Sequence, residues 1–187
     1  MNTTDNTPYR YVMVDLETLG TNPLTAPVLE IAAIPFNETK STGIPYTANP
    51  SYESNILLGR RPDLDTAIWW LHQERPAPIH GTQTILDAMI GLTAWATKHT
   101  DKKTKWFCKG TNFDHPILND LMDALLITHP WKYYQWNDVR TLQKFFNITP
   151  EKSASHSAAQ DCLDQISIVQ KCFAILHQAD ATEKTNG

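Results

Sequence analysis

Val12-Met13-Val14-Asp15-Leu16-Glu17-Thr18-Leu19-Gly20 is the most informative stretch of this chain. It begins with apolar and β-branched residues, which are typical of a buried strand. Asp15 and Glu17 are two residues apart, and side chains at i and i+2 of a strand point to the same side. Two such carboxylates repel each other unless a cation lies between them, and Mg²⁺ prefers oxygen ligands of this kind. This stretch alone leaves two interpretations open, a metal-binding strand end or a strand that runs into an acidic turn.

The composition is that of one globular domain. The chain has 187 residues, of which 41% are hydrophobic, and this is enough for a proper core. We expect a single domain over residues 9–178, with flexible tails at 1–8 and 179–187. No apolar run approaches the ~20 residues that span a bilayer, so we expect no membrane contact.

Charge and cysteine content restrict the environment and the partners. The polar start of the chain lacks a secretory signal pattern, and three cysteines without zinc-like spacing indicate buried thiols in a reducing compartment, so a cytoplasmic location is expected. A net charge of −4 argues against bulk electrostatic binding of nucleic acid but leaves a local patch open.

The order of periodic segments predicts an α/β fold with a mixed sheet. Three strands without room for helices between them imply an antiparallel meander, and the later strands alternate with helices. The predicted strands are 9–15, 28–36, 52–58, 106–108 and 131–136. The predicted helices are 63–73, one that starts after Thr84, one that opens at 112–114, one that Asn137 caps and that ends near 146, and a long one over 156–178.

Two further acids and a histidine stand where they could join the first pair. Asp114 follows a strand and a glycine turn at a helix start, where its alternative role is that of a simple N-cap. His156 and Asp161 begin the last predicted helix, and His156 alone could equally be a loop-edge residue without a role. At i and i+5 these two side chains would flank one groove.

Taken together, these segments resemble a known family. Val-Asp-Leu-Glu-Thr (14–18), Asn-Phe-Asp (112–114) and His-x-Ala-x-x-Asp (156–161) occur in the order and contexts of the DEDDh 3′→5′ exonucleases. The resemblance covers roughly residues 11–172 and implies a ribonuclease H-like fold, a five-stranded mixed sheet flanked by helices on both faces.

A finer resemblance points to one group within this superfamily. Three segments are similar to RNase AS and to phage exonucleases of the exodeoxyribonuclease VIII-like type. They are 15–20, 67–71 and 138–142. The Thr-rich segment 39–50 departs from the family pattern in its length.

The resemblance implies a two-metal mechanism. Asp15, Glu17, Asp114 and Asp161 would hold two divalent cations, Mg²⁺ or Mn²⁺, which together clamp one phosphodiester. One ion would activate a water and the other would stabilise the leaving 3′ oxygen. His156 would be the general base, because the usual histidine pKa of ~6.5 suits proton removal near neutral pH.

Substrate contacts are expected beside the first motif. In the family, the residues at Glu17 and Thr18 contact the terminal 3′-hydroxyl and the residue at Leu19 packs on the last base. Asn112 is also expected to contact the substrate. Trp70 could stack on a base or belong to the core, with equal weight. The lysine-rich run 98–109 could bind phosphates, although a solvated loop is the simpler interpretation.

The predicted function is therefore a metal-dependent 3′→5′ exonuclease. It would act on single-stranded 3′ ends or 3′ overhangs of RNA, with DNA left open, and release nucleoside 5′-monophosphates. The alternative is a non-catalytic binding module that sequesters nucleic-acid ends or cyclic oligonucleotides. Relatives are often homodimers, so a homodimer is expected.

Overall fold

The computed structural model describes residues 9–39, 43–149 and 156–185 and contains a five-stranded mixed sheet in the order β3-β2-β1-β4-β5. The β1–β2 and β2–β3 pairs are antiparallel, whereas β1–β4 and β4–β5 are parallel. This arrangement confirms the predicted fold class. The strands are β1 (Tyr11–Thr18), β2 (Val28–Phe36), β3 (Tyr46–Ala48), β4 (Lys105–Cys108) and β5 (Trp136–Asp138).

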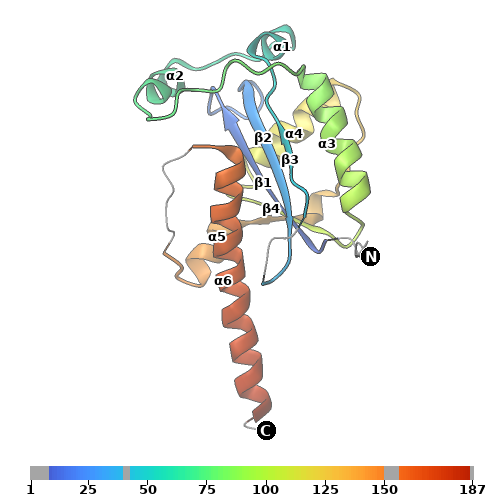
Figure 1. Ribbon diagram of the computed structural model, residues 1–187, viewed down its shortest axis with the longest axis vertical. Coiled ribbons are helices and arrows are strands. Elements are labelled where there is room, and N and C mark those ends of the chain that lie inside the picture. The colour runs from blue at the N-terminus through green and yellow to red at the C-terminus, as the bar shows by residue number, and fades with distance from the viewer. Residues whose placement is uncertain (1–8, 40–42, 150–155, 186–187) are drawn as a thin grey trace, which may run out of the picture.

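Helices cover both faces of the sheet, and α6 extends well beyond its edge (Figure 1). None of the helices in the described residues is long and apolar enough to cross a membrane. The helices are α1 (Tyr52–Leu57), α2 (Leu64–Leu71), α3 (Ile85–His99), α4 (Asp114–Ala124), α5 (Val139–Phe145) and α6 (Ala158–Thr185), with a 3₁₀ turn η1 (Tyr133–Gln135) before β5.

The alternation of side chains along β1 assigns its residues to two cores. Val12, Val14 and Leu16 pack with α3 and α4 on one face, and Met13 packs with α5 and α6 on the other. Since i and i+2 side chains share a face, Asp15 lies on the same side of β1 as Met13. The acidic end of the strand therefore faces α6.

The prediction of a third strand at residues 52–58 is wrong. The segment predicted as strand 52–58 forms α1, because Ser51 caps it by accepting a hydrogen bond from the Ser54 N–H at 3.2 Å. Its residue Asn55 is buried and pairs through its side-chain amide with the backbone of Val28. The third strand is β3 instead, a three-residue strand inside the Thr-rich segment 39–50, where no strand was predicted.

The later boundaries also shift. The predicted strand 131–136 is replaced by η1 and the later β5, because Trp131 is buried in the core against Trp106 at 4.8 Å between ring centroids. Asp138, not Asn137, caps α5, since its carboxylate accepts from two backbone N–H groups. The last helix begins at Ala158, not at 156, and continues to Thr185, beyond the predicted end.

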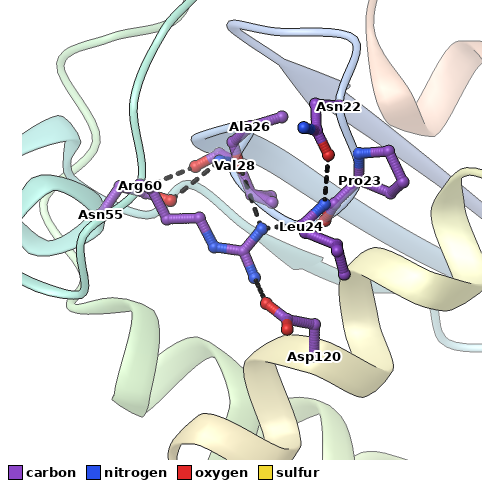
Figure 2. Close-up of polar contacts among 8 residues, drawn as sticks. All are labelled: Asn22, Pro23, Leu24, Ala26, Val28, Asn55, Arg60 and Asp120. Carbon is purple, nitrogen blue, oxygen red and sulfur yellow. Dashed lines mark hydrogen bonds and ion pairs between the residues drawn. The ribbon is translucent and has the colours of Figure 1, made fainter.

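A buried arginine anchors the connection between β1 and β2 (Figure 2). The Arg60 guanidinium is 3% exposed and donates to the carbonyls of Pro23 and Ala26 at 3.0 and 3.4 Å. It also forms an ion pair with Asp120 of α4. The backbone that follows Thr18 is therefore held against α4 by a charged group that is itself desolvated.

Candidate active site

Three carboxylates meet at the end of β1. One side-chain oxygen from each of Asp15, Glu17 and Asp161 lies within 4.8 Å of the other two. The first two come from β1 and the third from the first turn of α6, which packs on the face that these β1 side chains share. The sequence analysis selected all three, and the structure brings them together.

Burial makes the charged forms of these acids costly. Desolvation raises the pKa of Glu17 to about 8, and the charges of Asp161 and Glu30 add to the shift. The pKa of Asp15 is raised well above its ordinary value, by desolvation first and then by Asp114 and Glu17. Desolvation also raises the pKa of Asp161, while a hydrogen bond from Glu17 opposes that shift.

Asp114 lies beside these three carboxylates rather than among them. It is 5% exposed and is the first residue of α4, whose N-cap position belongs to Phe113. Its N-cap interpretation therefore fails. Burial raises its pKa to about 7, and its charge is the largest carboxylate contribution to the pKa of Asp15. Asp114 is thus electrostatically coupled to the other acids.

His156 precedes α6 and has a left-handed backbone with φ of 40°. It is not on the helix, so the predicted i and i+5 relation to Asp161 does not apply. Its imidazole makes a T-shaped contact with Trp69 at 4.9 Å between ring centroids, and its charge lowers the pKa of Asp161. The histidine therefore lies within electrostatic range of the acids and beside an aromatic wall.

Sequence reasoning missed Gln165, one helical turn after Asp161. Its side-chain amide donates to Asp15 Oδ1 at 2.6 Å, and the residue is 4% exposed. Its Oε1 is buried with no hydrogen-bond partner among the described residues. The spacing from Asp161 was the available signal, since i and i+4 share a helix face.

Arg75 and Glu30 form a second polar group that the sequence analysis missed. Glu30 lies directly opposite Glu17 in the β1–β2 register and is 8% exposed. The Arg75 guanidinium pairs with its carboxylate and also donates to the His156 carbonyl at 2.5 Å. The signal in the sequence was a single acid inside the apolar strand 28–36.

A cavity of about 430 Å³ lies beside Glu17, and two tryptophans are among the residues that line it. Trp69 is 43% exposed, whereas Trp70 is 3% exposed and donates its indole N–H to the Thr18 carbonyl at 3.0 Å. Trp70 is thus a buried support, and Trp69 is the accessible ring. The lining residues are Leu16, Glu17, Thr18, Gly20, Thr21, Asp65, Thr66, Trp69, Trp70 and Phe113.

The remaining predicted substrate contacts differ in accessibility. Leu19 is 9% exposed and packs with Leu29 and Trp70 below the cavity. Asn112 is exposed two residues before Asp114. From the lysine-rich run, the charge of Lys109 acts on Asp161.

The donor set fits hard divalent cations. Every donor in the described cluster is a carboxylate oxygen, which suits Mg²⁺ or Mn²⁺ rather than softer metals. The cost of bringing these groups together without a cation appears as the raised pKa of Glu17 and Asp15. Cations would remove that cost, so the residues present fit the expected group.

Comparison with solved structures agrees with the fold. Exonuclease I in its apo form has a TM-score of 0.63 at 14% identity, over 92% of this chain and 45% of that chain. E. coli Exonuclease I in complex with a 5cy-dT13 oligonucleotide has a TM-score of 0.64 at 14% identity, over 92% of this chain and 44% of that chain. The chain thus spans less than half the length of these structures.

Comparison by sequence identifies the family. No curated protein matches the chain. The model of the 3'-5' exoribonuclease Rv2179c-like domain matches residues 10–173, which is most of the chain and includes every acid of the site. The chain therefore belongs to the 3'-5' exoribonuclease Rv2179c-like family and is a domain of the 3′→5′ exonuclease type.

Proposed function

We propose that this domain hydrolyses phosphodiester bonds at single-stranded 3′ ends or 3′ overhangs of RNA and releases nucleoside 5′-monophosphates. The observation that carries the proposal is the convergence of Asp15, Glu17 and Asp161 within 4.8 Å, with Glu17 also lining a cavity that contains two tryptophans. DNA is the alternative polymer. The family description favours RNA, whereas Exonuclease I was solved with a dT13 oligonucleotide.

We propose that four acids hold two divalent cations. Asp15, Glu17 and Asp161 would supply the central carboxylate ligands, and Asp114 would complete the ligand set directly or through water. Gln165 supports this role by orienting the Asp15 carboxylate through its 2.6 Å hydrogen bond. When bound, the cations would supply Lewis-acid activation of water and stabilisation of charge on the leaving 3′ oxygen.

His156 is the proposed general base. Its imidazole would accept the proton of the attacking water, and its effect on the pKa of Asp161 places it within electrostatic range of the acids. The contact with Trp69 limits the directions in which the ring can turn. The 3′-terminal base would stack on Trp69, because this ring is exposed in the cavity whereas Trp70 is buried below it.

The proposal extends to the narrower group and to the setting. The segments at 15–20, 67–71 and 138–142 favour the RNase AS and phage-like group. Cys108, Cys162 and Cys172 are free and buried, which favours a reducing compartment such as the cytoplasm. A homodimer stays a prediction, to be checked by light scattering.

A substrate panel tests the activity. Labelled single strands, duplexes and 3′ overhangs of RNA and DNA are digested in Mg²⁺, Mn²⁺ or EDTA, and the products are identified by chromatography. Metal-dependent release of 5′-monophosphates from the 3′ end is expected, with loss in Asp15→Asn and retention in Asp123→Asn, a surface acid paired with His129. Tight binding without product over hours in Mn²⁺ would instead support the non-catalytic binding module.

A further inference from the structure

Three separate segments converge on the backbone at the start of α6. Glu30 is the third residue of β2, Arg75 follows α2, and His156 precedes α6. Arg75 Nη1 donates to the His156 carbonyl at 2.5 Å and to Glu30 Oε2 at 3.2 Å. One guanidinium therefore connects β2, which is paired on both sides in the sheet, with the backbone of the proposed general base.

Glu30 holds the other side of the same turn. Its Oε2 accepts a hydrogen bond from the Ala158 N–H at 3.2 Å, so it satisfies a free amide at the α6 N-terminus. Its Oε1 accepts from the Asn49 amide at 3.0 Å. Glu30 thus fixes the helix start, and Arg75 fixes the carbonyl two residues earlier.

The backbone at His156 requires such support. Its φ of 40° lies in the left-handed region, which a non-glycine residue adopts at a cost. Such a conformation persists only where surrounding contacts determine it, and these outliers concentrate at active sites. The structure supplies those contacts through Arg75 on one side and the Trp69 ring on the other.

We propose that Arg75, held by Glu30, is a positioning residue that fixes the His156 backbone so that its imidazole faces the acid cluster. This inference rests on the proposed function, because it concerns the residue assigned there as general base. Arg75 acts through His156 and touches none of the reacting atoms. Its side chain is 34% exposed and belongs to none of the hydrophobic clusters of the described residues.

A double-mutant cycle separates this role from a general structural one. Arg75→Ala is expected to lower kcat by ~10- to 100-fold with a much smaller change in KM, because misplaced catalytic groups cost rate rather than substrate binding. In a His156→Ala background the same change should cost less than about threefold, since two residues that act as one unit are not additive. Arg75→Lys should restore part of the rate, because an ammonium keeps the charge and can still donate but lacks the planar fork of the guanidinium.

Control variants and measurements separate this role from other causes of a lower kcat. Arg10→Ala removes the same charge from a side chain that is 76% exposed at the far end of β1, and it should leave kcat unchanged. Arg75→Ala leaves the buried Glu30 carboxylate without its ion pair, so its melting temperature should fall, and kcat is therefore measured well below the unfolding transition of both proteins. In ¹³C-histidine-labelled protein, the His156 signal, assigned by its loss in His156→Ala, should broaden when Arg75 is removed.

The outcomes are distinct. An equal loss on removing Arg75 with or without His156 would overturn the inference, as would an unchanged kcat and an unchanged His156 signal in Arg75→Ala. In either case, a wild-type protein that degrades the panel and is slowed by His156→Ala would leave the proposed function intact. A wild-type protein without metal-dependent activity would refute the proposed function, and the inference with it.

Discussion

Replacing Glu17 by glutamine should stabilise the metal-free protein while abolishing its activity. The pKa of Glu17 is about 8 in the native state, compared with an ordinary value of 4.5. Below pH 4.5 the carboxyl is protonated in both the folded and unfolded chain, so it imposes no penalty. Between pH 4.5 and 8 the unfolded chain releases this proton first, and the native state loses stability as the pH rises.

The magnitude follows from the width of that window. Each pH unit costs about 1.4 kcal/mol, so the penalty at pH 7 is at most about 3.5 kcal/mol. Neighbouring acids supply part of the shift, and their own protonation reduces it. We therefore expect Glu17→Gln to gain about 2 kcal/mol at pH 7 in EDTA, or roughly 4–8 °C in melting temperature for a domain of this size.

Thermal unfolding across pH measures this effect. Wild type, Glu17→Gln and the exposed surface control Glu53→Gln are compared in EDTA from pH 4.5 to 8.5 and then in Mg²⁺. The gain should disappear near pH 4.5, and Mg²⁺ should raise the wild type more than Glu17→Gln, because a ligand stabilises only the state that binds it. A gain that is independent of pH, or none at pH 8, would refute the electrostatic reasoning.

Three further perturbations test separate parts of the site. Trp69→Ala should raise KM for single strands by about 10- to 100-fold, in line with a stacking energy of ~1–3 kcal/mol per base, and an unchanged KM would exclude stacking there. Gln165→Leu should weaken Mn²⁺ binding by ~10- to 100-fold in a calorimetric titration, because the Asp15 carboxylate loses its orienting donor; equal affinity would contradict that role. Arg60→Ala should lower the free energy of urea unfolding by about 2 kcal/mol, because the carbonyls of Pro23 and Ala26 and the Asp120 carboxylate lose their donor, and a loss below about 0.5 kcal/mol would show that water replaces it.

The mixed five-stranded sheet could be predicted in part because β1 and β2 have clear local signals in the sequence. Both are long apolar segments that are buried on both faces. The third strand could not be predicted, since β3 has three residues and lies in a loop-like composition. The segment at Tyr52 has strand-like residues, but Asn55 hydrogen-bonds to the Val28 backbone and the segment folds as a helix. That contact joins residues 27 apart and leaves no local signal.

The acids of the site were predictable for a related reason. Asp15 and Glu17 interrupt an apolar strand, and Asp161 is the last residue of the motif His-x-Ala-x-x-Asp. Each of these acids therefore has a signature within a few residues. Glu30 has a similar signature, yet its purpose depends on Arg75 and on where α6 begins, neither of which its neighbours in sequence indicate. The groups that hold the site were therefore harder to find than those that would act in it.

The placement of Arg75 shows how the site can keep a negative charge beside a fixed cation. Its hydrogen bonds go to Glu30 and to the His156 carbonyl, although its charge also lowers the pKa of Glu17. If the guanidinium paired with Glu17 instead, it would occupy the oxygens that a divalent cation needs. Because Glu30 takes up Arg75 on the neighbouring strand, the three converging carboxylates stay available. The closely spaced negative charges that repel one another in the metal-free protein are the groups that would bind the cations. Both the stability and the activity of the protein should therefore depend on bound metal.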